Sequence, residues 1–145
     1  MKRILICGLP GAGKTFLATE LVKQLGDAVW FNADKVREEY NDWDFSPEGR
    51  LRQMERMKRL SGEAVSSGKY AITDFVCPTK SLREEFDADF VIWMNTLKEG
   101  RFEDTNRVFQ PLDDLEYDVI ITADEWWNTL HAGVWSKKII EMLNG

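Results

Sequence analysis

One octapeptide, residues 8–15 with the sequence GLPGAGKT, constrains the fold of this chain more than any other feature. It matches the pattern G-x-x-x-x-G-K-[ST] at every specified position, and the glycines of that pattern let the backbone wrap around an anion with its N–H groups pointing inward. In this pattern the lysine, Lys14, reaches the β- and γ-phosphates of a nucleotide, and the hydroxyl of Thr15 binds Mg²⁺. The octapeptide therefore predicts a phosphate-binding loop (P-loop).

The residues on either side of the P-loop support this prediction. A short apolar run at 3–7 is typical of a buried strand, and apolar residues recur at helical spacing from Phe16 to Leu25, where Gly26 ends the pattern. The N-terminus of such a helix attracts phosphate. The alternative is a Gly-rich turn that happens to precede Lys-Thr, but such a turn would need neither the strand before it nor the helix after it. A dinucleotide-binding fingerprint is excluded because Phe16 stands where its third small residue belongs. We expect ATP to contact the loop residues Gly8, Gly11, Ala12, Gly13, Lys14 and Thr15.

The composition narrows the class of protein. With 145 residues, 43% of them hydrophobic, the chain fits one compact domain (1–145) with a substantial core. Its net charge of −6 argues against a broad nucleic-acid-binding surface, which is normally basic. The two cysteines, Cys7 and Cys77, and the single His131 suggest neither a zinc site nor a disulfide, so we expect free thiols in a cytoplasmic protein. No apolar run approaches the roughly 18 residues of a membrane span, so no membrane partner is expected.

Five apolar runs read as strands, at 3–7, 28–31, 70–73, 89–94 and 118–122. Helical patterns lie between most of them, and this alternation predicts an α/β fold in three layers, a parallel five-stranded sheet with helices on both faces. The clearest helix has Ser46 as its N-cap and Pro47 as its first residue. Three tryptophans are expected to pack a last helix, from 128 or 129 to 143, onto the sheet: Trp126, Trp127 and Trp135.

The helix predicted at 46–67 carries a charge on its inner face. Helical spacing places these residues on its apolar face: Leu51, Met54, Met57, Leu60, Ala64 and Val65. Arg50 falls in the middle of that face and Gln53 on its edge. Arg50 is therefore either an anion-recognition residue or a structural arginine that reaches past the helix end or pairs with a carboxylate. The charged run at 55–59 is expected on the solvated face.

Two acidic residues follow predicted strands, at the edge of a parallel sheet where ligands bind. Asp34 comes after the second strand, one helical turn before Arg37. We expect Asp34 to orient or deprotonate an acceptor hydroxyl and Arg37 to anchor the acceptor. The alternative for Asp34, which does not exclude that role, is the N-cap of a helix at 35–40. Asp74 follows the third strand, where it serves either the Mg²⁺ shell or a turn. The candidate catalytic residues are thus Lys14, Asp34 and Asp74, and the candidate metal ligands Thr15 and Asp74.

The polar segment at 98–111 follows the fourth strand and is expected to form a mobile lid. Its basic residues Lys98, Arg101 and Arg107 are candidates to close over the phosphates. Phe109 is a candidate to stack on a purine ring. Closure of this kind excludes water, without which a kinase hydrolyses ATP. The alternative is a solvated surface loop.

Three blocks of the chain resemble the adenylylsulfate kinase (APS kinase) family of P-loop kinases. They are the P-loop at 8–15, the run NADKVR at 32–37 and the run FSPEGRLRQM at 45–54. The resemblance continues weakly at 75–78 and 108–113. The second and third blocks are similar to the family patterns D-G-D-N-V-R and F-S-P-E-D-R-x-x-N-I-R-R, respectively. The family's lid sequence, Lys-Gly-Leu-Tyr-Lys-Lys-Ala-Arg, is not present in this chain.

This resemblance implies a function for several residues. Asp34 corresponds to the carboxylate that activates the 3′-hydroxyl of adenylyl sulfate, and Phe109 to the aromatic that stacks on its adenine. The other implied substrate-binding residues are Arg37, Arg50, Gln53 in place of an asparagine, and Phe75. We therefore expect a kinase that uses ATP and Mg²⁺ to phosphorylate a hydroxyl of a small nucleotide, adenylyl sulfate.

Two other functions stay open at this point. The spacing Asn-x-Asp-x-x-Arg at 32–37 is also similar to polynucleotide 5′-kinases, so the acceptor is alternatively a polynucleotide end or a hydroxymethylated base. The acidic net charge weighs against that acceptor, because phosphate contacts supply most of such affinity. A nucleotide-dependent switch with little turnover is the third candidate, although no Asn-Lys-x-Asp guanine-recognition motif follows the later strands. The sequence does not indicate an oligomeric state.

Overall fold

The computed structural model describes residues 2–100, 103–129 and 132–145. It contains a five-stranded sheet in the order β2-β3-β1-β4-β5, in which every neighbouring pair runs parallel. The strands are β1 (Arg3–Cys7), β2 (Ala28–Asn32), β3 (Tyr70–Asp74), β4 (Phe90–Asn95) and β5 (Val119–Thr122). All five predicted strands are confirmed, each to within one residue at either end.

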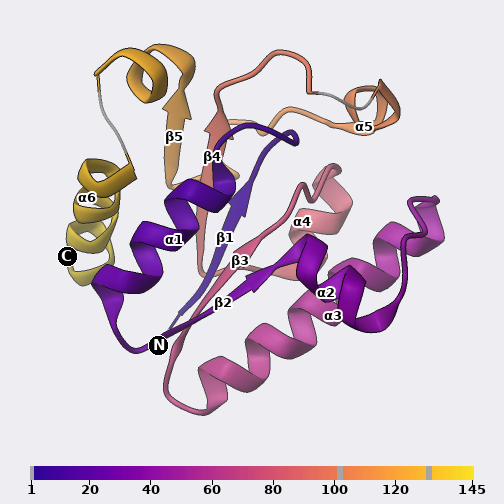
Figure 1. The fold of residues 1–145 in the computed structure, drawn as a ribbon, viewed down its shortest axis with the longest axis horizontal. Helices are drawn as coiled ribbons and strands as arrows, with labels where there is room; N and C mark the ends of the chain where they lie inside the picture. Colours follow the sequence, from indigo (N-terminus) through magenta and orange to yellow (C-terminus); the bar gives the residue numbers. More distant parts are fainter. Residues whose placement is uncertain (1, 101–102, 130–131) are drawn as a thin grey trace.

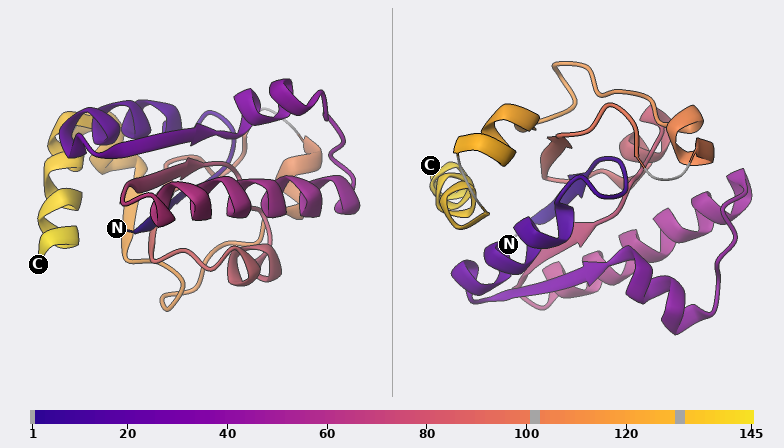
Figure 2. Two further views of the ribbon diagram at one scale, coloured as in Figure 1. Left: turned by 90° about the horizontal axis from the view of Figure 1, so that it is seen from below. Right: turned by 45° about the horizontal axis from the view of Figure 1, so that its top comes forward.

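Helices cover both faces of the sheet, which confirms the predicted three-layer α/β fold (Figure 1, Figure 2). They are α1 (Lys14–Leu25), α2 (Ala33–Tyr40), α3 (Pro47–Ser66), α4 (Lys80–Phe86), α5 (Glu103–Val108), the π-helical turn η1 (Glu125–Thr129) and α6 (Ala132–Asn144). The start predicted for the last helix is wrong, because the π-helical turn precedes α6. This turn gives its two tryptophans different surroundings: Trp126 is buried, whereas Trp127 is exposed.

Alternate residues of β1 enter two hydrophobic cores. Ile4 and Ile6 join the core covered by α1 and α6. Leu5 and Cys7 join the core covered by α3 and α4. A strand buried on both faces has a continuous apolar sequence, which is why the run at 3–7 shows no alternation. The predicted free thiols of Cys7 and Cys77 are both buried, and burial raises the pKa of Cys7 to about 12.

Side-chain caps begin α2 and α3. Asn32 accepts a hydrogen bond from the backbone N–H of Lys35 (3.1 Å). Ser46 accepts one from the backbone N–H of Gly49 (3.1 Å), which confirms the predicted cap. The capping alternative for Asp34 is wrong, because Asn32 occupies the N-cap and Asp34 lies within the first turn.

The buried face of α3 matches the predicted one in part, since Met54, Met57 and Ala64 are buried as predicted. Its buried residues are Gly49, Gln53, Met54, Met57, Ser61 and Ala64. Leu51, predicted on the inner face, is 39% exposed. Arg56, predicted in the solvated run at 55–59, has a side chain that is only 12% exposed. The reason is that polar side chains of α3 have partners outside the helix: Gln53 binds the backbone of α2, and Arg56 binds Asp42 in the segment before α3. This polar side of α3 is therefore covered.

The carboxyl ends of the strands meet at one edge of the sheet, and the strand arrows in Figure 1 point toward it, upward or to the upper right. The P-loop follows β1 at this edge, and Asn32 and Asp74 end β2 and β3. Parallel sheets of this kind bind their ligands outside the carboxyl ends of the strands. Within the described ranges, no helix has the length and apolar character needed to cross a membrane.

Candidate active site

A cavity of about 810 Å³ opens at the carboxyl edge of the sheet. P-loop residues line one part of it, and residues of α2, α3 and the segment between them line another. The site residues predicted from the sequence that line this cavity are Gly11, Gly13, Lys14, Thr15, Asp34, Arg37, Arg50, Gln53, Asp74 and Phe75. Gly8, Ala12, Arg107 and Phe109 are not among its lining residues in the described part of the chain, and Arg101 lies outside the described residues.

The P-loop adopts a backbone conformation that requires glycine. Gly13 has a φ of 103°, and a Cβ atom there would lie 2.7 Å from the indole of Trp126. Lys14 is buried, and its Nζ donates hydrogen bonds to the carbonyl oxygens of Gly8 (2.8 Å) and Leu9 (2.9 Å). The ammonium group therefore lies against the loop that is predicted to hold phosphate.

Asp74, at the end of β3, lies beside Thr15. Its Oδ2 accepts hydrogen bonds from Thr15 Oγ1 (3.2 Å) and Asn32 Nδ2 (3.0 Å). Burial raises the pKa of the Asp74 carboxyl above its usual value, while the charge of Lys14 and these hydrogen bonds act in the opposite direction. A carboxylate and a hydroxyl are hard oxygen donors, so this pair fits the Mg²⁺ site predicted for Thr15 and Asp74.

The two site residues predicted after β2 have different surroundings. Asp34 is exposed in the first turn of α2 and lines the cavity. Arg37, one turn later, is only 4% exposed, and its Nη1 donates hydrogen bonds to the carbonyl oxygens of Asp42 (3.0 Å) and Asp44 (3.1 Å). Its guanidinium carbon lies 4.1 Å from the centre of the Phe45 ring. Arg37 therefore holds the segment before α3 in addition to lining the cavity.

Arg50 and Gln53 come from the first turns of α3. Arg50 Nε donates a hydrogen bond to the carbonyl oxygen of Phe45 (2.8 Å), and its guanidinium carbon lies 6.0 Å from the centre of that ring. Gln53 is 3% exposed, and its Nε2 donates to the carbonyl oxygen of Ala33 (3.0 Å). The arginines Arg37 and Arg50 thus meet at Phe45, although they come from different helices.

The segment predicted as a lid contains α5. Thr105 of this helix lines the cavity. Asn106 Oδ1 accepts a hydrogen bond from the backbone N–H of Gly100 (2.7 Å). Arg107 is exposed and forms an ion pair with Glu103 (3.4 Å). Of the described residues in this segment, Thr105 is the one that faces the cavity.

The two phenylalanines predicted to bind substrate pack in or against one hydrophobic core. Phe75 is 6% exposed and stacks edge-to-face on Phe86, with 5.2 Å between ring centres, although it also lines the cavity. Phe109 packs against the same core, and the guanidinium carbon of Arg83 lies 5.9 Å from its ring centre. In this arrangement Phe109 is partly buried against the core, and a contact with a purine ring would require the segment to move.

Four exposed aromatic residues of the cavity lining had no predicted binding role: Phe16, Trp43, Phe45 and Trp127. Trp127 was expected to pack the last helix, which is wrong, because its indole is 58% exposed and its Nε1 lies 3.5 Å from the carbonyl oxygen of Thr96. The available signal for Trp43 and Phe45 was the alternation of acidic and aromatic residues at 42–45. No comparable signal marked Trp127.

Comparison with known proteins identifies a family and a relative of this chain. A family model described as an AAA domain matches residues 4–92. The adenylyl-sulfate kinase of Staphylococcus haemolyticus (strain JCSC1435) is 35% identical over 83 residues, which are 54% of this chain and 42% of that protein. The chain therefore spans less than half the length of this relative.

The solved structures that share the fold include two kinases. A sugar kinase from Janibacter sp. HTCC2649 has a TM-score of 0.75 at 13% identity, covering 99% of this chain and 95% of that one. The APS kinase of Mycobacterium tuberculosis, in complex with AMPPNP and APS, has a TM-score of 0.69 at 17% identity, covering 99% and 98%. Because the AAA domain model also matches more than half of the sequence, including the P-loop, the chain belongs to that AAA domain family and has the fold of P-loop kinases.

Proposed function

We propose that the protein transfers the γ-phosphoryl group of ATP to a hydroxyl of a small nucleotide, with adenylyl sulfate as the acceptor. The cavity carries this proposal, because Lys14 and Thr15 of the P-loop line it together with Asp34 and Arg50. Phosphoryl transfer depends almost entirely on positioning and electrostatic stabilisation, so donor and acceptor must be held in one such space. The sequence similarity to the adenylyl-sulfate kinase of S. haemolyticus favours this acceptor.

The P-loop side of the cavity has the residues needed for the donor. Within the described residues, no group of three or more acidic, histidine or cysteine side chains gathers as a metal site. Thr15 and Asp74 would therefore hold Mg²⁺ with phosphates and water completing its shell, as is usual for this ion. When bound, Mg²⁺ neutralises charge on the β- and γ-phosphate oxygens. Lys14 adds a positive charge beside the same phosphates.

The α2–α3 side has the residues needed for the acceptor. Asp34 presents an exposed carboxylate to the cavity, so it is the candidate to accept the proton of the hydroxyl as the new O–P bond forms. Arg50 places a guanidinium in the same lining and is the candidate to bind an anionic group of the acceptor. Asp34 thus activates the hydroxyl, and Arg50 orients the molecule that carries it.

The test of this function is a panel of acceptors incubated with the protein, Mg²⁺ and γ-labelled ATP. The panel contains adenylyl sulfate, nucleosides, shikimate, gluconate, single-stranded DNA and hydroxymethylated DNA. We expect label on adenylyl sulfate. Label on DNA and none on adenylyl sulfate would replace the proposed acceptor by a polynucleotide, and ATP binding without transfer to any acceptor would favour a nucleotide-dependent switch.

Replacement of Trp127 by alanine should weaken ATP binding, because its exposed indole in the cavity lining is the candidate to stack on the purine. We expect the KM for ATP to rise roughly tenfold, or ~1.4 kcal/mol, within the range measured for a base stacked on an aromatic side chain. Leu115→Ala, at a residue that is 97% exposed, is the control for loss of an exposed apolar side chain. An unchanged KM for ATP in Trp127→Ala would assign the purine to another surface.

Replacement of Arg50 by alanine should weaken acceptor binding while the KM for ATP stays constant. Loss of a charge-assisted hydrogen bond of about 1.5–3 kcal/mol raises the acceptor KM by about ten- to a hundredfold. Lysine should not restore binding if the contact is bidentate, because an ammonium lacks the planar fork of a guanidinium. Arg59→Ala, at an exposed arginine of the same helix paired with Glu63, is the matched control. If ATP binding falls instead, Arg50 belongs to the donor side.

A further inference from the structure

Asn32 lies where the P-loop side and the α2–α3 side of the cavity meet. It ends β2, it is the N-cap of α2, and it is partly exposed in the cavity lining. The register of the sheet pairs Asn32 with Asp74, the last residue of β3. Two neighbouring strands therefore bring an amide and a carboxylate together at the ligand-binding edge. No function was predicted for this amide.

Both ends of the Asn32 amide have partners. Oδ1 accepts a hydrogen bond from the backbone N–H of Lys35 (3.1 Å), and Nδ2 donates one to Asp74 Oδ2 (3.0 Å). The opposite orientation would place the NH₂ group against a backbone N–H and the amide oxygen against a carboxylate, so these two partners fix the side chain. Asp74 Oδ2 also accepts a hydrogen bond from Thr15 Oγ1 (3.2 Å). A chain of hydrogen bonds thus runs from the P-loop to the first turn of α2, which carries Asp34.

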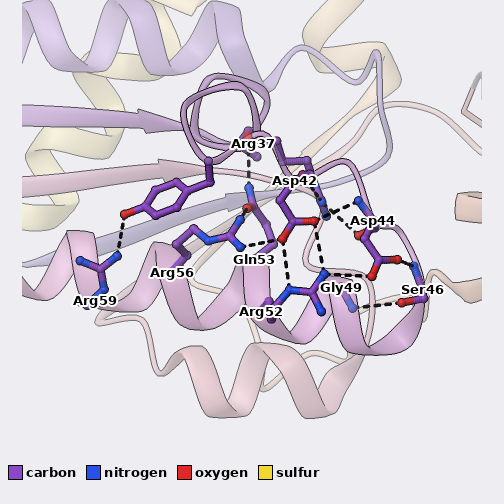
Figure 3. A network of polar contacts seen from close by, with 11 residues as sticks. Arg37, Asp42, Asp44, Ser46, Gly49, Arg52, Gln53, Arg56 and Arg59 are labelled. Atoms are coloured by element: carbon purple, nitrogen blue, oxygen red, sulfur yellow. Dashed lines mark hydrogen bonds and ion pairs between the residues drawn. The ribbon is translucent and has the colours of Figure 1, made fainter.

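A second contact holds the same turn from α3. Gln53 Nε2 donates a hydrogen bond to the carbonyl oxygen of Ala33 (3.0 Å), the residue before Asp34. Gln53 Oε1 accepts one from Arg56 Nη1 (3.1 Å), and Nη2 of this arginine donates to Asp42 (2.6 Å) (Figure 3). Because α3 holds the turn as well, loss of the bridge to β3 changes the setting of the turn without releasing α2.

We propose that Asn32 is a positioning residue, which sets the candidate base Asp34 relative to the Mg²⁺ site predicted at the P-loop. This role rests on the proposed function, because the base and the metal site both belong to it. Phosphoryl transfer depends on the alignment of the acceptor hydroxyl with the transferred group, and a misplacement of about 1 Å costs about a hundredfold in rate. A side-chain bridge between the two halves of the site provides this alignment.

An amide suits this role better than the other capping side chains do. It supplies an acceptor for the backbone N–H and a donor for the carboxylate from one rigid group. Asn32→Asp would keep the cap but place a second negative charge beside Asp74. Asn32→Ser would keep a cap with a hydroxyl that is one bond shorter than the amide nitrogen. The cap and the bridge are therefore separable by substitution.

Hydrogen exchange tests the bridge in the protein without ATP or Mg²⁺. Asp74→Ala removes the partner of the Asn32 NH₂ group, so the amide is free to turn and the cap of α2 weakens. We expect exchange of the Lys35 backbone N–H to become about fivefold faster, equivalent to ~1 kcal/mol, the usual contribution of an N-cap. In Asn32→Ser the hydroxyl caps α2 without Asp74, so adding Asp74→Ala should not change that rate.

The backbone N–H of Leu82 is the internal control, because the Thr79 hydroxyl caps it (3.2 Å) at the start of α4, outside the cavity lining. Its exchange rate should stay constant in every variant. If Asp74→Ala leaves the Lys35 rate unchanged, the bridge does not hold the amide, and the positioning role is overturned whatever the acceptor. Should Asp74→Ala fail to fold, Asp74→Ser removes the carboxylate but keeps a polar group in the buried site, with the same expected result.

Kinetics with γ-labelled ATP test the effect on the base. Asn32→Ser should lower kcat by about ten- to a hundredfold, while the acceptor KM and the dissociation constant of Mg·ATP change by less than about twofold. Thr79→Ser, which also replaces an N-cap residue by serine, is the matched control and should keep the wild-type kcat. A wild-type kcat in Asn32→Ser overturns the positioning role, and a rise in either binding constant alone makes Asn32 a ligand-binding residue instead.

The outcomes separate this role from the proposed function. If adenylyl sulfate is phosphorylated and Asn32→Ser has the wild-type kcat, the positioning role fails and the proposed function stands. If another acceptor of the panel is labelled instead, the proposed acceptor fails, and kcat of Asn32→Ser with that acceptor decides the positioning role. If no acceptor is labelled, both fail, even where exchange at Lys35 shows the bridge.

Discussion

Replacing Lys14 by alanine is expected to lower kcat for phosphoryl transfer by about a hundredfold or more while the fold stays intact. The ammonium lies at the P-loop, where a point charge stabilises the transition state more than it stabilises bound ATP. Lys14→Ala also removes the hydrogen bonds from Nζ to the carbonyl oxygens of Gly8 and Leu9, but the bond from the Ala12 N–H to the carbonyl oxygen of Leu9 (3.1 Å) and the left-handed Gly13 remain in the loop. Single-turnover kinetics with γ-labelled ATP and the best acceptor measure this effect.

The control for this variant is Lys23→Ala, a lysine of the same helix whose side chain is 67% exposed and pairs with Glu20. It should keep the wild-type kcat and melting temperature. Retention of more than about a tenth of kcat in Lys14→Ala, against the loss expected for removal of a transition-state contact, would mean that the loop does not serve catalysis.

Replacing Asp34 by asparagine is expected to preserve ATP binding and to lower kcat by roughly 10²–10⁴, the usual contribution of a general base. The amide keeps the shape of the side chain but cannot take the proton of the acceptor hydroxyl. Because Asn32 caps α2, the substitution leaves that helix with its N-cap, and a structural loss is not expected. ATP binding is followed by titration, and transfer by turnover at saturating acceptor.

Glu38→Gln, at an exposed acidic residue of the same helix, is the matched control for charge removal. It should leave transfer unchanged. Unchanged turnover in Asp34→Asn would assign Asp34 to a surface role and move the base to Asp74, whose carboxyl lies deeper in the site and is already shared with Thr15.

Local features of the sequence were sufficient to predict the framework of this fold. The P-loop pattern, the five apolar runs and the cap at Ser46 each depend on neighbouring residues, and β1, the other strands and the start of α3 lie where these features indicate. The rule that parallel strands end at the ligand-binding edge then brings Asp34 and Asp74 toward the P-loop, and both line the same cavity. Short-range chemistry and the topology of a parallel sheet account for this agreement.

The tertiary structure decided which side of α3 is buried and which aromatic residues border the cavity. Helical spacing shows that Leu51 and Arg56 lie on different sides of α3, but not which side meets another element. The segment at 42–45 docks on α3 and shelters Arg56, while Leu51 remains exposed. Phe109 and Trp127 also differ from expectation. Phe109, expected to stack on a purine, packs on a core, whereas Trp127, expected to pack the last helix, lines the cavity. Helical periodicity determines the direction in which each side chain leaves the helix axis. Its burial depends on residues that are distant in the sequence and come into contact only when the chain has folded.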